Sequence, residues 1–372
     1  MFCCSKGAIG IGYDICHLAR REYVTPDPYL RNKKGKGMNG QIRNLVVILI
    51  ALCLARAAFA QDAKLIAEAK KEGRAVVYGS LESDIFDDIK KSFEKKTGIP
   101  VDYWRAAAAS VTDRVLSERK AGRPLYDVVL TNAGPMQIML KEDIFANYSS
   151  PSNKNFPKEF IHPGLGPSYR TGVVGIIYNK AILKPEAAPK SLEDLLKPEY
   201  RGKLAMPDPT RGALPAMWLA SLYKIMGKEK AEKYIHDLAA TKPLIVEGVL
   251  NAAERVTTGE TPIGISYLKY VVAFGQKGAP MEYVRLEKML GHGHGVALSN
   301  RASHPNAGKA FIDFFLSDES MKIMAKMGEF VMRKGIYPLL ADADKIQVVE
   351  MDELDAATYA EKGKEYRKLF LQ

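Results

Sequence analysis

Apolar residues follow two alternating periods between residue 62 and about residue 140. Phe86, Ile89 and Phe93 recur at helical spacing, which predicts a helix that begins at Ser83 and ends at Gly98. Short β-rich runs alternate with such helices, giving predicted strands at 74–78, 100–105 and 126–130 and further helices at 62–72, at 110–120 and after 134. Strands and helices in alternation predict a parallel sheet with right-handed crossovers.

A second α/β region follows a loop-like stretch over 151–167. The long β segment 169–180, with its glycines, fits a strand running between two lobes. Beyond it the pattern predicts strands at 203–206, 263–267 and 295–298, a return crossing at 282–286, and helices at 191–197, 213–226, 228–239, 246–259, from 268 onward, at 304–316 and in the tail. We therefore expect an α/β chain with two lobes joined by a two-strand hinge. Residues 61–170 begin the first lobe and residues 171–274 form the second. Residues 275–372 contain the return crossing and lie mostly in the first lobe.

One polar loop connects a predicted strand to an apolar helix that begins at Ala213. It contains Asp208, Thr210, Arg211 and Gly212. The N-terminus of a helix offers unpaired backbone N–H groups and a positive dipole end, so a loop of this kind can hold a small anion. These four residues are candidate ligand contacts.

Each strand of the first lobe ends in small or polar residues. Ser80, Arg105, Thr131 and Asn132 stand at or just after these strand ends. Ligands of open α/β sheets bind beyond the carboxyl ends of the strands, so these residues are candidates for the opposing wall of a site. The alternative is that they form ordinary strand-to-helix turns without a ligand.

The first 60 residues differ from the remainder. Residues 38–60 resemble a secretory signal, with Arg43, an apolar run of about ten residues, and a small-x-small site that predicts cleavage after Ala60. Residues 1–37 read as an over-extended start. An uncleaved anchor and a lipoprotein are the alternatives to cleavage. We expect the mature protein in the periplasm.

Cysteine and charge narrow the function further. All four cysteines precede Gln61, which excludes a disulfide scaffold, a cysteine nucleophile and a thiolate metal site from the mature chain. Nine Lys/Arg and three Asp/Glu also precede it, so the net charge of +11 falls to +5 from Gln61 onward. A mildly basic chain is not built to bind nucleic acid.

The order of several segments resembles an extracellular solute-binding protein of an ABC importer, in the branch that contains ferric-iron and polyamine binders. The matching pieces include VVYGSLESDIFDDIKKSFEKKTGIPVDYWR, YDVVLTNAGP, GVVGIIYNK, LEDLLKPEYRGKLAMPDP and GVALSNRASHPNAGKAFIDFFLSDE. The resemblance implies a two-lobe periplasmic-binding-protein fold of type II-like form, parallel-rich sheets flanked by helices, a solute in the cleft, and delivery to membrane permease subunits. It implies no enzymatic activity and no cofactor, and we expect a monomer.

The ligand class follows from one position of this resemblance. Ferric binders that resemble the chain carry two adjacent tyrosines where this sequence has Lys269 and Tyr270. A lysine would repel Fe(III), although Tyr267 lies close enough in sequence to offer a second phenol. This lysine, with Arg211 and Thr210 opposite and Ser80, Arg105 and Thr131 across the cleft, favours a carboxylate, phosphonate or phosphate ester. Arg170 is a further candidate ligand contact. The alternatives are a ferric ion, and arginines that only pair with surface carboxylates.

Two other chemistries remain open. His292-Gly293-His294 is the one tight histidine pair, which we interpret as an exposed turn before a strand rather than as a metal site, because no third ligand stands near it in sequence. No phosphate-cradling loop or nucleophile elbow is present. A periplasmic enzyme on the same two-lobe fold is the remaining alternative.

Overall fold

The computed structural model describes residues 62–371, which all belong to one compact unit. The signal sequence, its cleavage site and the four cysteines lie outside this part. A helix over 62–72 opens it. The further helices are α2 (Ser83–Thr97), α3 (Ala108–Lys120), α4 (Ala133–Lys141), α5 (Ala213–Ser221), α6 (Tyr223–Met226), α7 (Lys228–Ala240), α8 (Val249–Thr258), α9 (Lys269–Gly275), α10 (Pro305–Phe315), α11 (Asp318–Lys326) and α12 (Ala356–Phe370).

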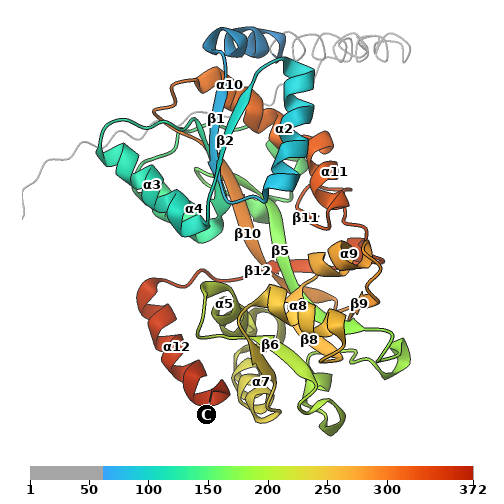
Figure 1. Cartoon of the computed structure of the whole chain (residues 1–372). Helices are drawn as coiled ribbons and strands as arrows, with labels where there is room; N and C mark the ends of the chain where they lie inside the picture. The colour runs from blue at the N-terminus through green and yellow to red at the C-terminus, as the bar shows by residue number, and fades with distance from the viewer. Residues whose placement is uncertain (1–61, 372) are drawn as a thin grey trace, which may run out of the picture. The chain divides into compact units, whose positions relative to one another are not determined.

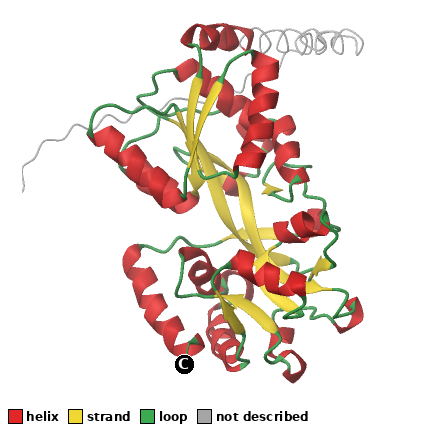
Figure 2. Cartoon of the chain, in the orientation of Figure 1, coloured by secondary structure: helices red, strands yellow, loops and turns green. Residues whose placement is uncertain are grey.

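The strands form one sheet that continues through both lobes (Figures 1 and 2). Its main path runs β2-β1-β3-β10-β5-β8-β6-β7, with β4, β9 and β11 paired to β5 and β12 paired to β10. Their bounds are β1 (Ala75–Gly79), β2 (Val101–Arg105), β3 (Val128–Asn132), β4 (Ile161–His162), β5 (Gly166–Asn179), β6 (Leu204–Pro207), β7 (Leu244–Val246), β8 (Ile263–Tyr267), β9 (Met281–Tyr283), β10 (Lys288–Leu298), β11 (Phe330–Val331) and β12 (Gln347–Glu350).

The first lobe contains the expected parallel unit. β1 pairs in parallel with both β2 and β3, so the carboxyl ends of all three strands lie at one edge. Helices α2, α10 and α11 bury apolar side chains on one face of these strands. Helices α3 and α4 cover the other face with a second apolar cluster. The alternation of strands and helices in the sequence is thus confirmed.

Two long antiparallel strands carry the chain between the lobes. β5 pairs with β10 from Val174 opposite Leu290 to Ser168 opposite Gly295. The first-lobe end of β10 pairs with β3, and the second-lobe end of β5 pairs with β8. The register shifts between His294 and Gly295, which is a β-bulge at the crossing. The expected two-strand hinge is therefore present.

The second lobe has its own parallel strands. β8 pairs with β6 and β6 with β7, all in parallel. Helices α5, α7 and α12 pack on one face, and α8 and α9 on the other. The expected helix at 213–226 is divided into α5 and α6, and the one at 191–197 is a short 3-10 turn over Glu193–Leu196.

The return crossing was predicted at the wrong residues. Residues 281–283 form β9, which pairs with the far end of β5 and stays in the second lobe. The chain returns through β10 instead. Its glycines suggested a turn, but they leave room for neighbouring strands: a Cβ on Gly293 would lie 2.7 Å from both Ser168 Oγ and Glu350 Oε1.

The C-terminal region also differs from the expected division into lobes. After β11, Leu340, Ala343 and Ile346 pack into the second-lobe core, and β12 pairs with the second-lobe end of β10. Helix α12 then packs against α5 and α7. The chain thus crosses a third time, and residues from about 340 onward contribute to the second lobe rather than the first.

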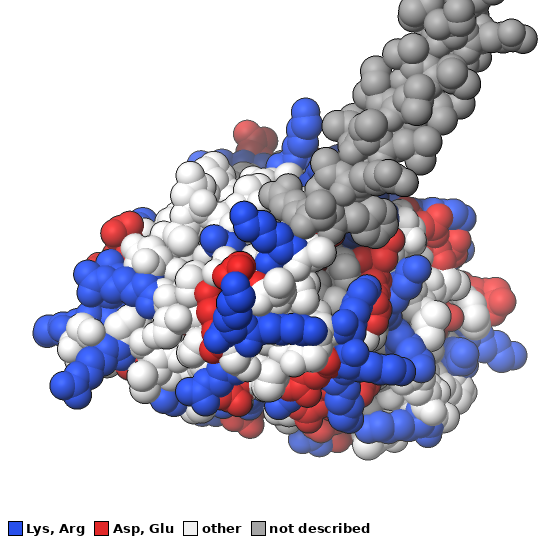
Figure 3. Space-filling view, turned by 90° about the horizontal axis from the view of Figure 1, so that it is seen from above, with Lys and Arg blue, Asp and Glu red and all other residues white. Residues whose placement is uncertain are grey.

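Positive and negative side chains are mixed on the face of the molecule seen in Figure 3. No helix within residues 62–371 combines the length and the apolar character that a bilayer crossing requires.

Candidate functional site

A cavity of about 230 Å³ lies where the hinge strands pass from one lobe to the other. Its wall combines the carboxyl ends of the first-lobe strands, the crossing part of β5 and β10, and the start of α9. Ligands of α/β sheets bind at such strand ends. The lining residues are Ser80, Glu82, Arg105, Ala106, Ala107, Ala108, Asn132, Arg170, Gly172, Tyr267, Lys269, His294 and Glu329.

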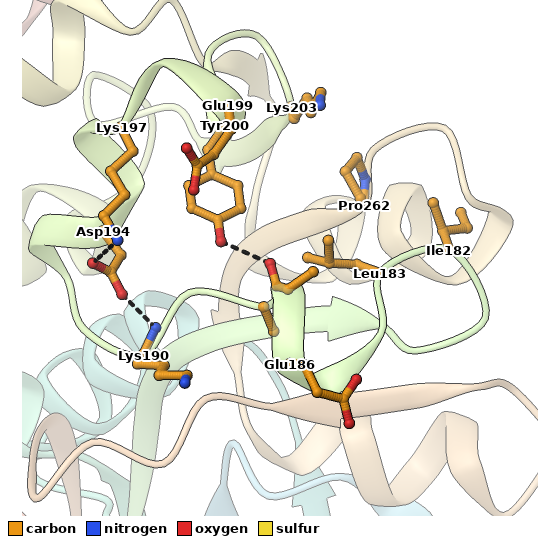
Figure 4. Close-up of a pocket in the computed structure, with 12 residues that line it drawn as sticks. Ile182, Leu183, Glu186, Lys190, Asp194, Lys197, Glu199, Tyr200, Lys203 and Pro262 are labelled. Carbon is orange, nitrogen blue, oxygen red and sulfur yellow. Dashed lines mark hydrogen bonds and ion pairs between the residues drawn. The ribbon is translucent and has the colours of Figure 1, made fainter.

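A larger cavity, about 650 Å³, lies on the second lobe (Figure 4). Three of its polar side chains are already paired: the Tyr200 hydroxyl donates to the Ala187 carbonyl at 2.7 Å, and Lys197 Nζ lies 2.8 Å from Asp194 Oδ1. It holds no strand-end residue of the first lobe and no predicted site residue. The smaller cavity is therefore the better candidate.

Two cations and two carboxylates form a closed ring beside this smaller cavity. Lys269 Nζ lies 2.8 Å from Glu82 Oε1 and 2.9 Å from Glu329 Oε1. The Arg170 guanidinium lies 3.0 Å from Glu82 Oε2 and 2.7 Å from Glu329 Oε1. We call these four residues the ion ring. Its charges cancel, so Arg170 and Lys269 are neutralised before any solute arrives.

Burial decides which part of the ion ring a solute meets. The side chains of Glu329 and Arg170 are 3% and 4% exposed, that of Lys269 is 18% exposed, and that of Glu82 is 39% exposed. Burial alone would raise the pKa of Glu82, but Arg170 and Lys269 outweigh it and hold the pKa at about 2. The ring therefore presents an ionised carboxylate to the cavity.

The first lobe contributes two positively charged features to the cavity wall, an arginine side chain and the N-terminus of a helix. Arg105 has no ion-pair partner within the described residues, and it ends β2 directly before α3. Helix α3 begins with Ala107 as N-cap, which makes no side-chain cap bond, and its first turn carries no acidic residue. Its first N–H groups and its dipole therefore remain available to an anion.

Hydroxyl and amide groups stand beside this helix end. Ser80 Oγ lies 3.0 Å from Thr131 Oγ1 and 3.4 Å from Asn132 Oδ1. Ser80 and Asn132 line the cavity, while Thr131 is fully buried behind Ser80 and orients its hydroxyl. The N-terminus of α4, which follows Asn132, is less open, because the Glu353 carboxylate contacts Gly134 there.

The histidine pair does not form an exposed turn. His292 and His294 are 6% and 8% exposed and lie within β10, because the neighbouring glycines belong to a packed strand. His292 Nε2 lies 2.9 Å from Glu353 Oε1. Burial lowers the pKa of His294 well below its ordinary value. Its Nδ1 lies 3.2 Å from the His292 carbonyl, which can only accept, so Nδ1 carries the proton and Nε2 is an acceptor.

The two tyrosines differ in their relation to the cavity. Tyr267 lines it and packs on Gly172, where an added Cβ would lie 2.6 Å from the Tyr267 ring. Tyr270 does not line it, and its ring stacks on Phe274 at a centroid distance of 5.5 Å. Lys269 Nζ lies 5.9 Å and 5.7 Å from the two ring centroids. The two ring centroids are themselves 6.3 Å apart, so the lysine lies to one side of both phenols.

The loop after β6 is not brought to this cavity. Asp208 Oδ1 accepts from the Thr210 amide at 2.8 Å and from its hydroxyl at 2.7 Å, which closes a local turn before α5. The Arg211 side chain is 72% exposed and lies 3.7 Å from Asp208. Gly212 supplies the positive φ of 81° that the helix start requires. Asp208, Thr210 and Arg211 thus contact one another, and none of the four residues lines the site.

Three cavity residues carried no signal as ligands in the sequence. Glu82 directly precedes the helix predicted to begin at Ser83, Glu329 was assigned to the tail, and His294 was assigned to an exposed turn. Each reaches the cavity through tertiary contacts between distant segments. Within residues 62–371, no group of three or more His, Cys, Asp or Glu side chains has an arrangement suited to a metal ion.

Two α/β lobes, hinge strands between them and a polar cavity at the crossing define the class of two-lobe binding proteins. The chain belongs to the bacterial extracellular solute-binding protein family, whose model matches residues 123–359. This is a family of solute-binding components of ABC importers, which confirms the resemblance seen in the sequence.

Individual relatives are distant. The Fe(3+)-binding periplasmic protein of Serratia marcescens is 23% identical over 76% of this chain and 83% of its own length. The fructose-6-phosphate-bound periplasmic protein AfuA of Actinobacillus pleuropneumoniae has a TM-score of 0.59 at 21% identity, covering 80% of this chain and 99% of its own. Iron-bound HitA of Pseudomonas aeruginosa has a TM-score of 0.62 at 22% identity, covering 79% and 99%. These structures share the fold.

Proposed function

We propose that this protein captures a small anionic solute in the cavity between its lobes and delivers it to an ABC permease from the periplasm. The solute is a phosphate ester, a phosphonate or a carboxylate. The mature chain begins after Ala60, acts as a monomer, needs no cofactor and carries out no reaction. The mixed charges of Figure 3 fit a partner other than nucleic acid.

One observation carries the proposal: Arg105 and the uncapped start of α3 meet at the same cavity. An arginine donates two parallel hydrogen bonds to a carboxylate or phosphate, and a helix N-terminus adds backbone donors to the same group. Arg170 and Lys269, expected from the sequence to hold the anion, serve the ion ring instead. The anion-binding end therefore lies in the first lobe.

The named relatives include binders of both iron and a sugar phosphate, and the side chains of this chain favour the second chemistry. An iron site of the ferric-binder kind needs tyrosine phenolates. Burial raises the pKa of both Tyr267 and Tyr270, and Lys269 Nζ lies 5.9 Å and 5.7 Å from their ring centroids. A cation at that position opposes Fe(III), whereas the first-lobe donors suit a phosphate group.

Thermal unfolding of the purified protein tests the proposal with four probes: fructose 6-phosphate, inorganic phosphate, citrate and Fe(III). A ligand that binds the folded state stabilises it by about 2.7 kcal/mol at a hundredfold excess over its Kd. We expect an organic anion to raise the melting temperature. A rise with Fe(III) alone, and with none of the anions, would overturn the proposal.

A further inference from the structure

Glu82 occupies a singular position in the cavity. It is the N-cap residue of α2, yet its side chain makes no cap bond. The carboxylate turns instead toward Arg170 and Lys269, and it remains the most exposed member of the ion ring. The Glu82 carboxylate repels the anion that Arg105 attracts. Its presence in the wall of an anion site therefore suggests that it has another role in binding.

We propose that the Glu82 carboxylate accepts hydrogen bonds from hydroxyl groups of the solute. The site thereby selects a hydroxylated phosphate ester over a bare anion. This inference rests on the proposed function and names the solute class within it. The solute binds with its phosphate at Arg105 and the start of α3, and with its hydroxyl groups at Glu82.

Glu82 has acceptor capacity left for such hydroxyls. Lys269 donates to Oε1 at 2.8 Å and Arg170 donates to Oε2 at 3.0 Å. A carboxylate offers about four lone-pair positions in all, so each oxygen can accept one more hydrogen bond. The 39% exposure of the side chain leaves those positions accessible.

The added donor is a hydroxyl rather than an ammonium group. Lys269 and Arg170 already place two cations within 3.0 Å of this carboxylate. A third cation would be repelled by both, whereas a hydroxyl brings a donor without charge. His294 supports the same choice, since its neutral ring lines the cavity with Nε2 as an acceptor.

The size of the cavity is compatible with a solute that has an organic moiety as well as an anionic group. The cavity volume of about 230 Å³ is somewhat below the roughly 300–1,000 Å³ of typical small-molecule sites, but it is several times the roughly 30 Å³ of one water molecule, so it has room for more than a bare anion. A bare phosphate would meet Glu82 as a like charge, and its own P–OH groups are the only donors that it could offer to the carboxylate. The carboxylate therefore penalises small inorganic anions.

Calorimetric titration of three probes tests the inference: fructose 6-phosphate, n-butyl phosphate and inorganic phosphate. The two esters share the charged group and differ in hydroxyls. In the unaltered protein we expect fructose 6-phosphate to bind at least tenfold more tightly than either other probe. In Glu82→Ala the three affinities should converge, and inorganic phosphate should bind more tightly than before. Glu82→Gln, which keeps a carbonyl acceptor and loses the charge, should keep part of the preference between the esters.

Glu361→Gln on α12 is the matched control, because it removes one exposed carboxylate far along the chain from the cavity residues and should leave all three affinities unchanged. Circular dichroism confirms that each variant is folded. If the preference for fructose 6-phosphate persists in Glu82→Ala, the inference fails while the anion site stands. If the unaltered protein binds both esters equally, the inference fails in the same way. If it binds none of the three probes, the inference fails together with the choice of a phosphate.

Discussion

Lys269 Nζ donates to Glu82 Oε1 at 2.8 Å, although the two residues lie 187 positions apart and belong to different lobes. The lysine thus acts as a counter-ion within the protein. Both side chains line the cavity, and the partner carboxylate is the more exposed of the two, at 39% against 18%. The ion ring both ties the lobes together and sets the polarity of the cavity.

Replacing Lys269 with methionine should destabilise the fold. The change leaves two carboxylates, one of them only 3% exposed, with Arg170 as their single cation. Breaking a buried charge pair costs about 3 kcal/mol or more. Urea denaturation should show this loss, and the double variant Lys269→Met/Glu82→Gln should recover much of it because the charges again balance. Lys277→Met, on an exposed turn, is the control; purely additive effects of the two changes would show that the ring is not coupled.

Replacing Arg105 with alanine should weaken anion binding without a large effect on stability. Hydrogen bonds to charged groups contribute about 1.5–3 kcal/mol, so the Kd should rise by about 10- to 100-fold. The free energy of unfolding should change by less than about 0.5 kcal/mol, because Arg105 pairs with no carboxylate in residues 62–371.

The control for Arg105 is Arg74→Ala, which removes an exposed arginine that pairs with Asp102 at 3.1 Å. It should leave solute affinity unchanged. Equal losses of affinity in both variants would mean that only the overall charge matters, and Arg105 would not be a ligand contact.

A methyl group on Gly172 should close part of the cavity wall. The added Cβ would lie 2.6 Å from the Tyr267 ring, so the ring must shift. We expect Gly172→Ala to cost about 1–3 kcal/mol of stability and to weaken solute binding. Gly363→Ala in α12 has no atom within 4 Å of the new methyl and should instead stabilise the protein by up to about 1 kcal/mol. A neutral Gly172→Ala would show that the Tyr267 ring moves freely.

The pKa of Glu82 predicts a loss of stability in acid. The folded-state pKa of about 2 lies below the ordinary value of 4.5, so the carboxylate contributes its full stabilisation above pH 4.5. That contribution falls as the pH drops from 4.5 toward 2. The difference in melting temperature between the unaltered protein and Glu82→Gln should therefore shrink across this window. A difference that is constant with pH would contradict the assigned pKa.

The periodic segments of the first lobe could be predicted because local pattern and final structure agree there. Strands 74–78, 100–105 and 126–130 match β1, β2 and β3 to within two residues at each end, and their order required a parallel unit. The crossing strand β10 could not be recognised in the same way. Its alternating glycines indicate a turn locally, and only the close approach of β5 and β12 explains them.

The candidate site likewise contains residues that local sequence pattern predicts and residues that it does not. Ser80, Arg105 and Asn132 were predictable because the carboxyl ends of parallel strands share one edge of a sheet. The loop after β6 has the same composition, yet Asp208 closes it into a local turn. The partners of Arg170 and Lys269 could not be predicted, since ion pairs between lobes leave no periodic trace in a sequence.

The third crossing of the chain bears on the order of folding. Tyr366 of α12 is fully buried in the second-lobe core, beside residues made about 150 positions earlier. Domains generally fold in the order in which they are synthesised. The second lobe, however, lacks part of its core until the residues of α12 have been made. The first lobe can assemble its sheet early, while the second lobe completes its core only when the final helix docks. Loss of α12 would therefore remove part of the second-lobe core, although the residues that line the cavity extend only to Glu329.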